Sequence, residues 1–234
     1  MKKALFIACA LGIIHAPNAR AGFVGTLEFT PLGCEVQNLC TLKYDFGFLD
    51  PKGGGWQTNA GDKTDGASIP GWAQAIIGGM FDEQFIKAAV IHDHYCNRHV
   101  RSWRATHQMF YDALLSSGVP LAKAQIMYFA VYSGGPRWTE LVKGDACPIG
   151  KMCLSSKSMM ADPSVHMMEQ EGSRYLVREE QYATEKFERH MAMAHAMMAE
   201  MGDKVTIKDL EKLAETLDPA DVFYQTGDYA AGQK

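Results

Sequence analysis

The most chemically suggestive residues of this chain are a histidine and an aspartate, His92 and Asp93, at the end of the apolar run Ala88–Ile91. The run has the spacing of a buried helix face, so at least one of the two polar side chains should be drawn into the interior. A buried histidine beside carboxylates can hold a proton near neutral pH or bind a metal through a neutral nitrogen. The pair therefore indicates a general base or a metal ligand.

A second group of polar residues lies upstream, in the turn TDGASIP at residues 64–70. Its glycine and its final proline shape the turn, and Ser68 can cap the helix that the proline begins. Loops of this kind often deliver a carboxylate to a site built on rigid helices. Asp65 is therefore the carboxylate that we expect to orient or polarise His92.

The turn and the later His–Asp pair together resemble domain of unknown function family 1353, found in bacteria and their phages. The similarity covers roughly residues 46–138. It implies a shared fold and no reaction, with shared polar positions at Asp65, Ser68, His92 and Asp93. The chain departs from the family pattern where tyrosine is common, at His94 or Cys96, and where aspartate is common, at His107.

Our leading functional hypothesis is a hydrolase in which His92 is the general base on a water, Asp65 supports it and Asp93 binds a cation or the substrate. The residues expected to support the site or bind substrate are Thr64, Ser68, Tyr95 and Arg104. The bond type is left open. The mechanism is similar to that of secreted phospholipases A2 only by analogy, because the resemblance is limited to His92-Asp93 and to the nearby Tyr95 and Cys96, whose order is reversed.

A metal-dependent version of this hypothesis places His92, Asp93 and His107 around a divalent cation, either zinc-like or calcium. Histidine and aspartate together suit a site that keeps a water on the ion. The competing hypothesis is a non-catalytic interaction module of the envelope or of phage, in which Asp65, Ser68 and His92 form a structural hydrogen-bond network.

The first 21 residues have the pattern of a signal peptide: Lys2 and Lys3, an apolar run over residues 4–14, and small residues at Ala19 and Ala21. The run is too short to span a bilayer, so we expect no transmembrane anchor in a mature, periplasmic or secreted protein. Cleavage would leave 20 basic and 27 acidic side chains, a net charge of about −7. This charge disfavours a nucleic-acid partner.

Five cysteines would remain after cleavage. Cys34 lies near Cys40 and Cys147 near Cys153, which fits two local disulfides in an oxidising compartment. The alternative is a four-thiolate zinc site, which the loose spacing within each pair disfavours. Cys96 would then be a free thiol buried on a helix.

The expected fold is α+β, with a small N-terminal antiparallel sheet, a helical core and a C-terminal helical hairpin. Short strands are expected within residues 26–30, 41–48 and 56–59, and helices follow Pro70. The expected organisation is a signal peptide (1–21), a core domain (22–143), a disulfide-stapled loop (144–165), a Met-rich helical hairpin (166–218) and a flexible tail (219–234).

The hairpin is expected to begin with an amphipathic helix from Leu176 to Met201, followed by a helix capped at Thr206. Its methionine-rich face suggests a protein partner or self-association through residues 176–217. Thioether and imidazole groups also allow a copper site, with His190 and His195 as candidate ligands. Arg98, Arg101 and Arg104 indicate that the neighbouring His94 and His99 lie at a solvated helix end.

Overall fold

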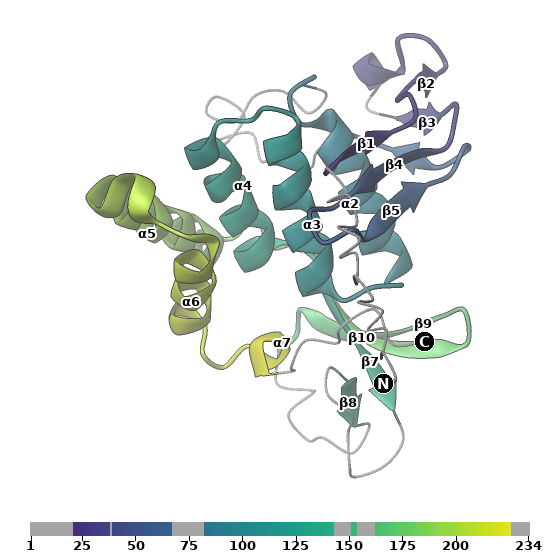
Figure 1. Cartoon of the computed structure of the whole chain (residues 1–234). Coiled ribbons are helices and arrows are strands. Elements are labelled where there is room, and N and C mark those ends of the chain that lie inside the picture. The colour runs from purple at the N-terminus through teal and green to yellow at the C-terminus, as the bar shows by residue number, and fades with distance from the viewer. Residues whose placement is uncertain (1–20, 38, 67–81, 143–150, 154–161, 226–234) are drawn as a thin grey trace, which may run out of the picture.

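Figure 1 shows the fold in a computed structural model that describes residues 21–37, 39–66, 82–142, 151–153 and 162–225. The architecture is α+β, as predicted, with small antiparallel sheets at the N-terminus and helices in the core and the C-terminal part. The helix predicted after Pro70, and Ser68 before it, lie outside the described residues.

Six short strands replace the three that the sequence predicts in the N-terminal part. They form two antiparallel three-stranded sheets, β1-β4-β5 and β2-β3-β6. Phe48 is paired with Phe23 on one side and with Trp56 on the other, so aromatic side chains line up across the first sheet. The strands are β1 (Gly22–Val24), β2 (Phe29–Thr30), β3 (Cys40–Leu42), β4 (Phe46–Leu49), β5 (Gly55–Thr58) and β6 (Lys63–Thr64).

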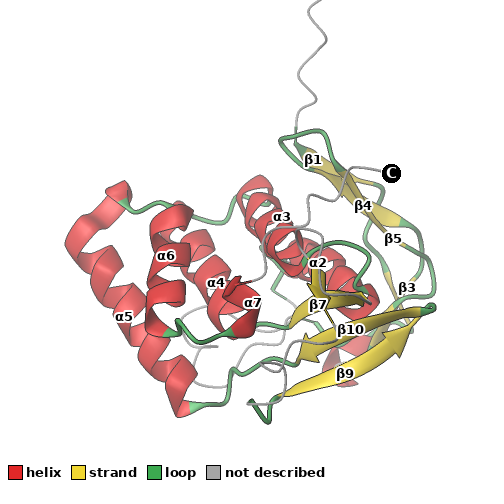
Figure 2. Ribbon diagram, turned by 90° about the horizontal axis from the view of Figure 1, so that it is seen from below, coloured by secondary structure: helices red, strands yellow, loops and turns green. Residues whose placement is uncertain are grey.

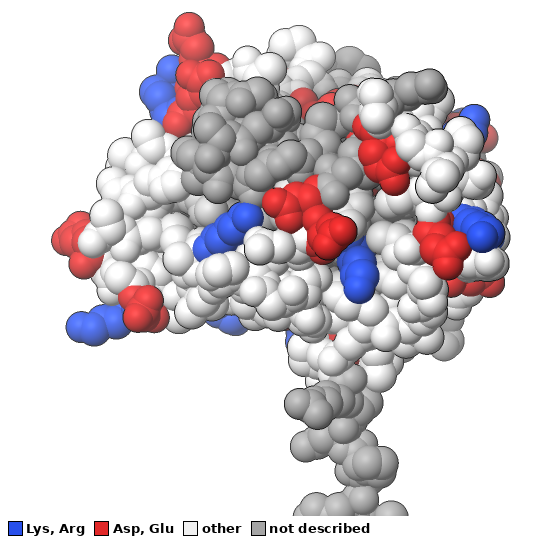
Figure 3. All heavy atoms as spheres, turned by 90° about the horizontal axis from the view of Figure 1, so that it is seen from above, with Lys and Arg blue, Asp and Glu red and all other residues white. Residues whose placement is uncertain are grey.

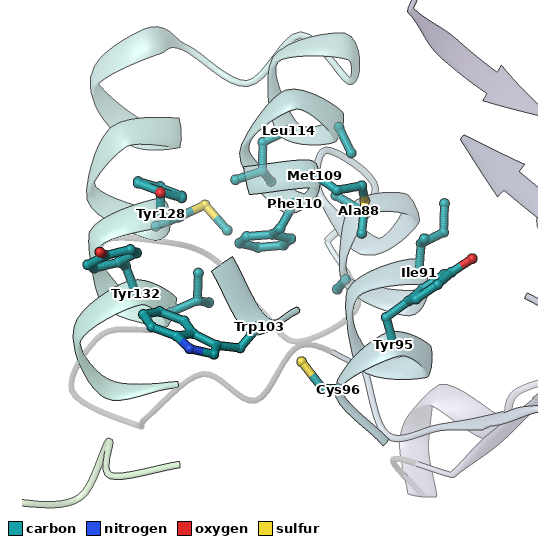
Figure 4. Packing of buried hydrophobic residues seen from close by; sticks show 14 of the residues in the cluster. Ala88, Ile91, Tyr95, Cys96, Trp103, Met109, Phe110, Leu114, Tyr128 and Tyr132 are labelled. Carbon is teal, nitrogen blue, oxygen red and sulfur yellow. The ribbon is translucent and has the colours of Figure 1, made fainter. Parts of the chain in front are cut away.

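The helical core consists of α2 (Ile86–Arg98), α3 (Trp103–Ser116) and α4 (Leu121–Gly134), which pack side by side in chain order. His99 ends α2 in the left-handed conformation, with φ 54°, and Ser102 caps α3 by accepting a hydrogen bond from the Ala105 amide at 3.2 Å. The four-residue turn makes α2 and α3 antiparallel neighbours. Figure 4 shows their apolar side chains packed together.

A third sheet, which the sequence does not predict, follows the helical core. It has the order β8-β7-β10-β9, in which β7 pairs parallel with β8 and antiparallel with β10. Leu176 is therefore a buried residue of a β-hairpin and not the start of a helix, which corrects the predicted bounds of the helical hairpin. The strands are β7 (Arg137–Val142), β8 (Lys151–Cys153), β9 (Val165–Gln170) and β10 (Ser173–Arg178).

The C-terminal helices are α5 (Glu185–Met201), α6 (Ile207–Leu217) and α7 (Val222–Gln225). Figure 2 shows α5 and α6 beside α4. Phe187 of α5 lies so close to Gly134 that a Cβ there would stand 2.4 Å from its ring, so only glycine permits this approach. The capping box at Thr206 and Asp209 forms as the sequence predicts.

The segment predicted as a flexible tail contains α7, which is tied to the core. Phe223 is completely buried, and its amide donates to Asp221 at 2.9 Å. The prediction was therefore wrong for residues 222–225, because one aromatic anchor and one buried carboxylate outweigh the lack of periodicity. Residues 226–234 lie outside the described part of the chain.

Cys34 and Cys40 form a disulfide, as predicted. Cys147 and the side chain of Cys153 lie outside the described residues, so their pairing stays a prediction. Cys96 is a buried free cysteine. None of the helices in the described part of the chain combines the length and the apolar character needed to cross a membrane.

Candidate functional site

The centre of the candidate site is a contact between two buried histidines on neighbouring helices. His92 of α2 and His107 of α3 are 5% and 0% exposed, and Nε2 of His92 lies 2.8 Å from Nδ1 of His107. The antiparallel packing of α2 on α3 brings these positions together, although 15 residues separate them in the chain.

Cys96 completes this centre from the next turn of α2. Residues four apart lie on the same face of a helix, so the thiol of Cys96 points to the same side as His92. Its Sγ lies 3.6 Å from Nε2 of His92, and the ligand atoms of all three residues lie within 4.8 Å of one another. Figure 4 shows Cys96 on the side of α2 toward Trp103, with Tyr95 on another side. We call His92, Cys96 and His107 the histidine–thiol cluster.

Each histidine also has an oxygen beside its outer ring nitrogen. Nε2 of His107 donates to the carbonyl oxygen of Pro136 at 3.1 Å, and Nδ1 of His92 lies 3.5 Å from Oδ1 of Asp93. A carbonyl only accepts hydrogen bonds, so the hydrogen of neutral His107 sits on Nε2. Its Nδ1 then presents a lone pair to His92.

Two members of the cluster, His107 and Cys96, are uncharged without a bound cation. Burial, reinforced by the nearby His92 and Arg137, holds the pKa of His107 well below its usual value. Burial, with the carboxylates of Asp93 and Glu180, raises the pKa of the Cys96 thiol well above its usual value. Cys96 is therefore a thiol, which is a poor nucleophile, unless a cation stabilises the thiolate.

Asp93 lies at the border between the cluster and solvent. Its side chain is 27% exposed, yet Oδ2 is buried and without a hydrogen-bond partner. Burial raises the pKa of this carboxyl, the hydrogen bond with His92 opposes that rise, and the charges of Asp65 and Glu180 add to it. Burying a carboxylate oxygen without a hydrogen-bond partner costs free energy. A ligand or ion that contacts Oδ2 would therefore be favoured.

Two residues of the predicted turn at residues 64–70, Asp65 and Thr64, differ in their exposure and in their contacts. Asp65 is exposed, and its charge reaches Asp93, whereas none of the described hydrogen bonds joins it to His92. Thr64 is buried and accepts a hydrogen bond from the Gly66 amide at 3.1 Å. Thr64 thus shapes the turn that carries Asp65.

Two predicted supporting residues make their described contacts away from the cluster. The Tyr95 hydroxyl accepts from the Gln57 amide at 3.1 Å, which fixes α2 on β5. Arg104 donates to Tyr132 and, at 3.1 Å, to Glu215, which joins α3 to α4 and α6. The charge of Arg104 also reaches the cluster, where it helps to lower the pKa of His107.

Two further histidines on and after α2 are not solvated as predicted. His94 pairs with Asp62 at 2.8 Å, and its side chain is 9% exposed. His99 is also buried, and its Nδ1 lies 2.8 Å from the Gln170 side-chain oxygen. The correction has one cause: β6 and the β9–β10 hairpin cover surfaces that the helix alone would expose.

The methionine-rich helix α5 buries part of its apolar face. Met191 and Ala194 are buried, and His190 lies 2.8 Å from the Ser133 hydroxyl of α4, whereas Met193 is half exposed. Packing on α4 accounts for the buried residues. Copper binding and self-association through residues 176–217 stay predictions.

Sequence reasoning missed the role of Cys96, although the signal was present in the four-residue spacing from His92. It also missed Glu180 and Tyr182, which follow β10 and lie within electrostatic reach of Asp93. A β-hairpin brings them near Asp93, although nearly 90 residues separate them from it in the sequence. No local sequence pattern indicates that contact.

Residues 40–131 match the model of the family described as "Protein of unknown function (DUF1353)". The resemblance to domain of unknown function family 1353 is confirmed over this segment. The DUF1353 segment holds β3 to β6 and α2 to most of α4, so it includes the whole histidine–thiol cluster.

Two curated relatives come from Sinorhizobium fredii. "Uncharacterized protein y4iH" is 53% identical over 113 residues, which cover 48% of this chain and 47% of the relative. "Uncharacterized protein y4jT" is 40% identical over 174 residues, which cover 70% of this chain and 52% of the relative. The chain thus spans about half the length of each. No solved structure matches the chain.

Proposed function

We propose that this protein is a hydrolase in which water activation depends on His92, as general base or as metal ligand, with Asp93 beside it. The observation that supports the proposal is the pair of contacts on one imidazole: Nε2 to His107 at 2.8 Å and Nδ1 near Asp93 at 3.5 Å. In many unrelated folds, a general base activates the nucleophile, and a further side chain holds that base in position by a hydrogen bond.

The orientation of His92 follows from the carbonyl of Pro136. Because this carbonyl accepts from Nε2 of His107 at 3.1 Å, Nδ1 of His107 accepts the hydrogen on Nε2 of His92. Neutral His92 then has its lone pair at Nδ1, where a water or a protonated Asp93 can donate to it, and Nδ1 of the protonated ring donates to the Asp93 carboxylate. Asp93 is partly exposed, so this side of the ring is the one that faces solvent.

In the metal-free form, Nδ1 of His92 takes a proton from a water molecule. The resulting hydroxide attacks the electrophilic atom of an ester, amide or phosphodiester, and the bond to the leaving group breaks. The imidazolium returns its proton to the leaving group, and Asp93 stabilises the positive charge in between. Exposed Asp65 adds to the acidic border of the site, which disfavours strongly anionic substrates.

The proposal is tested by assaying the purified protein on p-nitrophenyl butyrate, bis-p-nitrophenyl phosphate and isolated peptidoglycan. Turnover of one of them is expected, with a loss of roughly 100-fold or more in kcat for His92→Ala. His99→Gln is the matched control, because His99 is a buried histidine of the same region with a different partner. A His92→Ala protein with full activity would contradict the proposal.

The second candidate function is a non-catalytic interaction module. The observation that favours it is the burial of both histidines, 5% and 0% exposed and hydrogen-bonded to each other, which also fits a structural network. Half-exposed Met193 on α5 would contribute to a contact surface. Self-association in sedimentation velocity, lost in Met193→Glu, together with no turnover of any probe, would favour the module.

We also propose that the protein is exported after cleavage before Gly22. The Cys34–Cys40 disulfide supports this proposal, because disulfides persist in oxidising compartments. Expression in a bacterial host followed by N-terminal sequencing of the periplasmic fraction should give Gly22 as the first residue. An uncleaved chain in the cytoplasmic fraction would contradict it.

A further inference from the structure

We propose that the histidine–thiol cluster is a binding site for a zinc-class transition-metal ion, with Nε2 of His92, Sγ of Cys96 and Nδ1 of His107 as the three protein ligands. The inference deepens the proposed function, on which it rests for the role of the ion but not for its binding. Cys96 takes the place that sequence reasoning assigned to Asp93, because Asp93 lies at the opposite ring nitrogen of His92.

The ligand atoms are close enough for a tetrahedral ion after the Cys96 side chain turns, because its Sγ also lies 3.8 Å from Nδ1 of His92 and thus beside the ring. Nitrogen and sulfur ligands at ordinary zinc bond lengths stand about 3.6 Å apart, and two nitrogens about 3.3 Å apart. Sγ of Cys96 lies 3.6 Å from Nε2 of His92. The two nitrogens of His92 and His107 are 2.8 Å apart, so their side chains must separate by about half an ångström.

Both histidines already have the outer partners that metal-bound histidines use. A ligating histidine commonly donates its other N–H to a carboxylate or to a backbone carbonyl, which fixes the ring. Here Nδ1 of His92 faces Asp93 at 3.5 Å, and Nε2 of His107 donates to Pro136 at 3.1 Å. Metal binding requires that the hydrogen of His92 move from Nε2 to Nδ1, toward Asp93, and that the Cys96 thiol release its proton to solvent.

The ligand types select the class of ion. A thiolate and two imidazoles suit zinc, cobalt or copper, whereas calcium and magnesium take oxygen ligands. A divalent ion with one thiolate carries a charge of +1, and an ionised Asp93 at the second nitrogen of His92 balances it. The buried site thus reaches neutrality when the ion is bound, which limits the cost of desolvation.

Three protein ligands leave a fourth position of a tetrahedral ion for water or for substrate, as in catalytic zinc sites. A bound ion acidifies that water, so His92 serves as a ligand and not as the base in this form. Asp93 would hold the opposite ring nitrogen of His92, and the proton of an acidified water would pass to solvent. The ion would supply a hydroxide for attack on the same electrophiles.

The test is a titration of the chelator-treated full chain with Co²⁺ alone, followed by displacement with Zn²⁺. We expect one equivalent of Co²⁺ to give the visible bands of a tetrahedral ion and the near-ultraviolet charge-transfer band of a cobalt–thiolate bond. Cys96→Ser should lose the charge-transfer band, and His107→Gln should bind Co²⁺ at least roughly 100-fold more weakly. His99→Gln, the matched histidine control, should behave like the wild type.

A Cys147→Ser/Cys153→Ser double variant separates this site from the four-thiolate alternative, because Cys34 and Cys40 are already joined. The charge-transfer band should persist in that variant. A folded wild-type chain without the band, or a band that survives in Cys96→Ser, overturns the inference. Metal binding without hydrolysis supports the inference and counts against the proposed function. Hydrolysis that survives chelation, with no band, does the reverse.

Discussion

Two buried polar clusters meet at the Pro136–Arg137 peptide, and they differ in the kind of polar group that they bury. The arginine cluster consists of Arg137, Arg178 and Asp221; both arginines pair with the one carboxylate. Arg137 also donates to the carbonyl oxygens of Tyr132 at 2.6 Å and Ser133 at 2.7 Å. The buried Nε of each arginine has no hydrogen-bond partner among the described residues.

In the histidine–thiol cluster, His107 and Cys96 are uncharged, and beside it Oδ2 of Asp93 has no hydrogen-bond partner within the part of the chain that the structure describes. Buried ion pairs with many acceptors join elements together, here α4, β7, β10 and the residues before α7. The histidine–thiol cluster joins α2 to α3 and, through the Pro136 carbonyl, to the residue before β7, and it brings three metal-ligating atoms within 4.8 Å of one another. The comparison teaches that neither burial nor an unpartnered polar atom distinguishes a structural cluster from a binding site, because Nε of Arg137, Nε of Arg178 and Oδ2 of Asp93 are all buried without a partner in the described ranges. The difference lies in the groups themselves: two guanidinium groups repel a cation, whereas imidazole and thiol groups can bind one.

Both kinds of charge are also found on the surface. Figure 3 shows acidic and basic side chains interspersed over one face, and the described residues on that face form no extended basic patch. This agrees with the net negative charge of the sequence. The absence of a nucleic-acid partner stays a prediction.

The largest expected effect comes from breaking the arginine cluster. Asp221→Ala leaves two buried guanidinium groups unpaired and should lower the free energy of unfolding by about 3–5 kcal/mol, measured by urea denaturation. Asp218→Ala is the matched control, because its ion pair with half-exposed Lys186 should contribute about 1 kcal/mol or less. Equal losses in the two variants would show that the arginine cluster is not a structural anchor.

The histidine–thiol cluster should respond to metal instead. Zn²⁺ at roughly 100 times its dissociation constant should stabilise the wild type by about 2.7 kcal/mol, because the ion binds only the folded site. The gain should vanish in His107→Gln and persist in His99→Gln, measured by thermal unfolding with and without chelator. An equal gain in all three proteins would place the zinc elsewhere.

A smaller effect is expected at the outer contact of His92. Asp93→Asn keeps the shape of the side chain and removes its charge, so zinc affinity should fall roughly 10- to 100-fold, as for other outer partners of metal-bound histidine. Asp62→Asn is the control, because Asp62 pairs with His94 on another side of the same helix at 2.8 Å. Competition with a chromophoric chelator measures both, and equal affinities would remove Asp93 from the site.

The smallest expected effect is a pH dependence on α3. Burial, partly opposed by the hydrogen bond from Gln108, raises the pKa of Asp112 from 3.8 to about 6. The folded state therefore favours the protonated acid, and this group costs stability as pH rises from 4 through 6. Asp112→Asn should be more stable than wild type by about 1 kcal/mol at pH 7, after solvent screening, and equal at pH 3.5. Urea denaturation at both pH values measures the difference.

The sequence predicts the parts of the fold that depend on local pattern. The α3 and α4 helices, the capping box at Thr206 and the Cys34–Cys40 disulfide follow from spacing and residue type. The β9–β10 hairpin was not predicted, because the position of Leu176 fits the helical period of apolar residues that continues into α5. Its burial comes from β7, a partner more than 30 residues away.

The site was predictable only in part, for the same physical reason. His92 ends an apolar helix face, and His107 was a candidate partner that the packing of α2 on α3 brings to 2.8 Å. The role of Cys96 depends on which side of α2 meets α3, which is a tertiary property. The Pro136 carbonyl is a backbone group, so no residue type in the sequence indicates its role. It nevertheless determines that the lone pair of neutral His107 is at Nδ1.

The most direct test of the histidine–thiol cluster as a binding site is elemental analysis of the purified protein by inductively coupled plasma mass spectrometry, without added metal. Wild type and His99→Gln should each carry close to one equivalent of a zinc-class ion, and His92→Ala and Cys96→Ser should carry far less. Metal that is absent from every folded variant, or that is retained in all of them, would contradict the account.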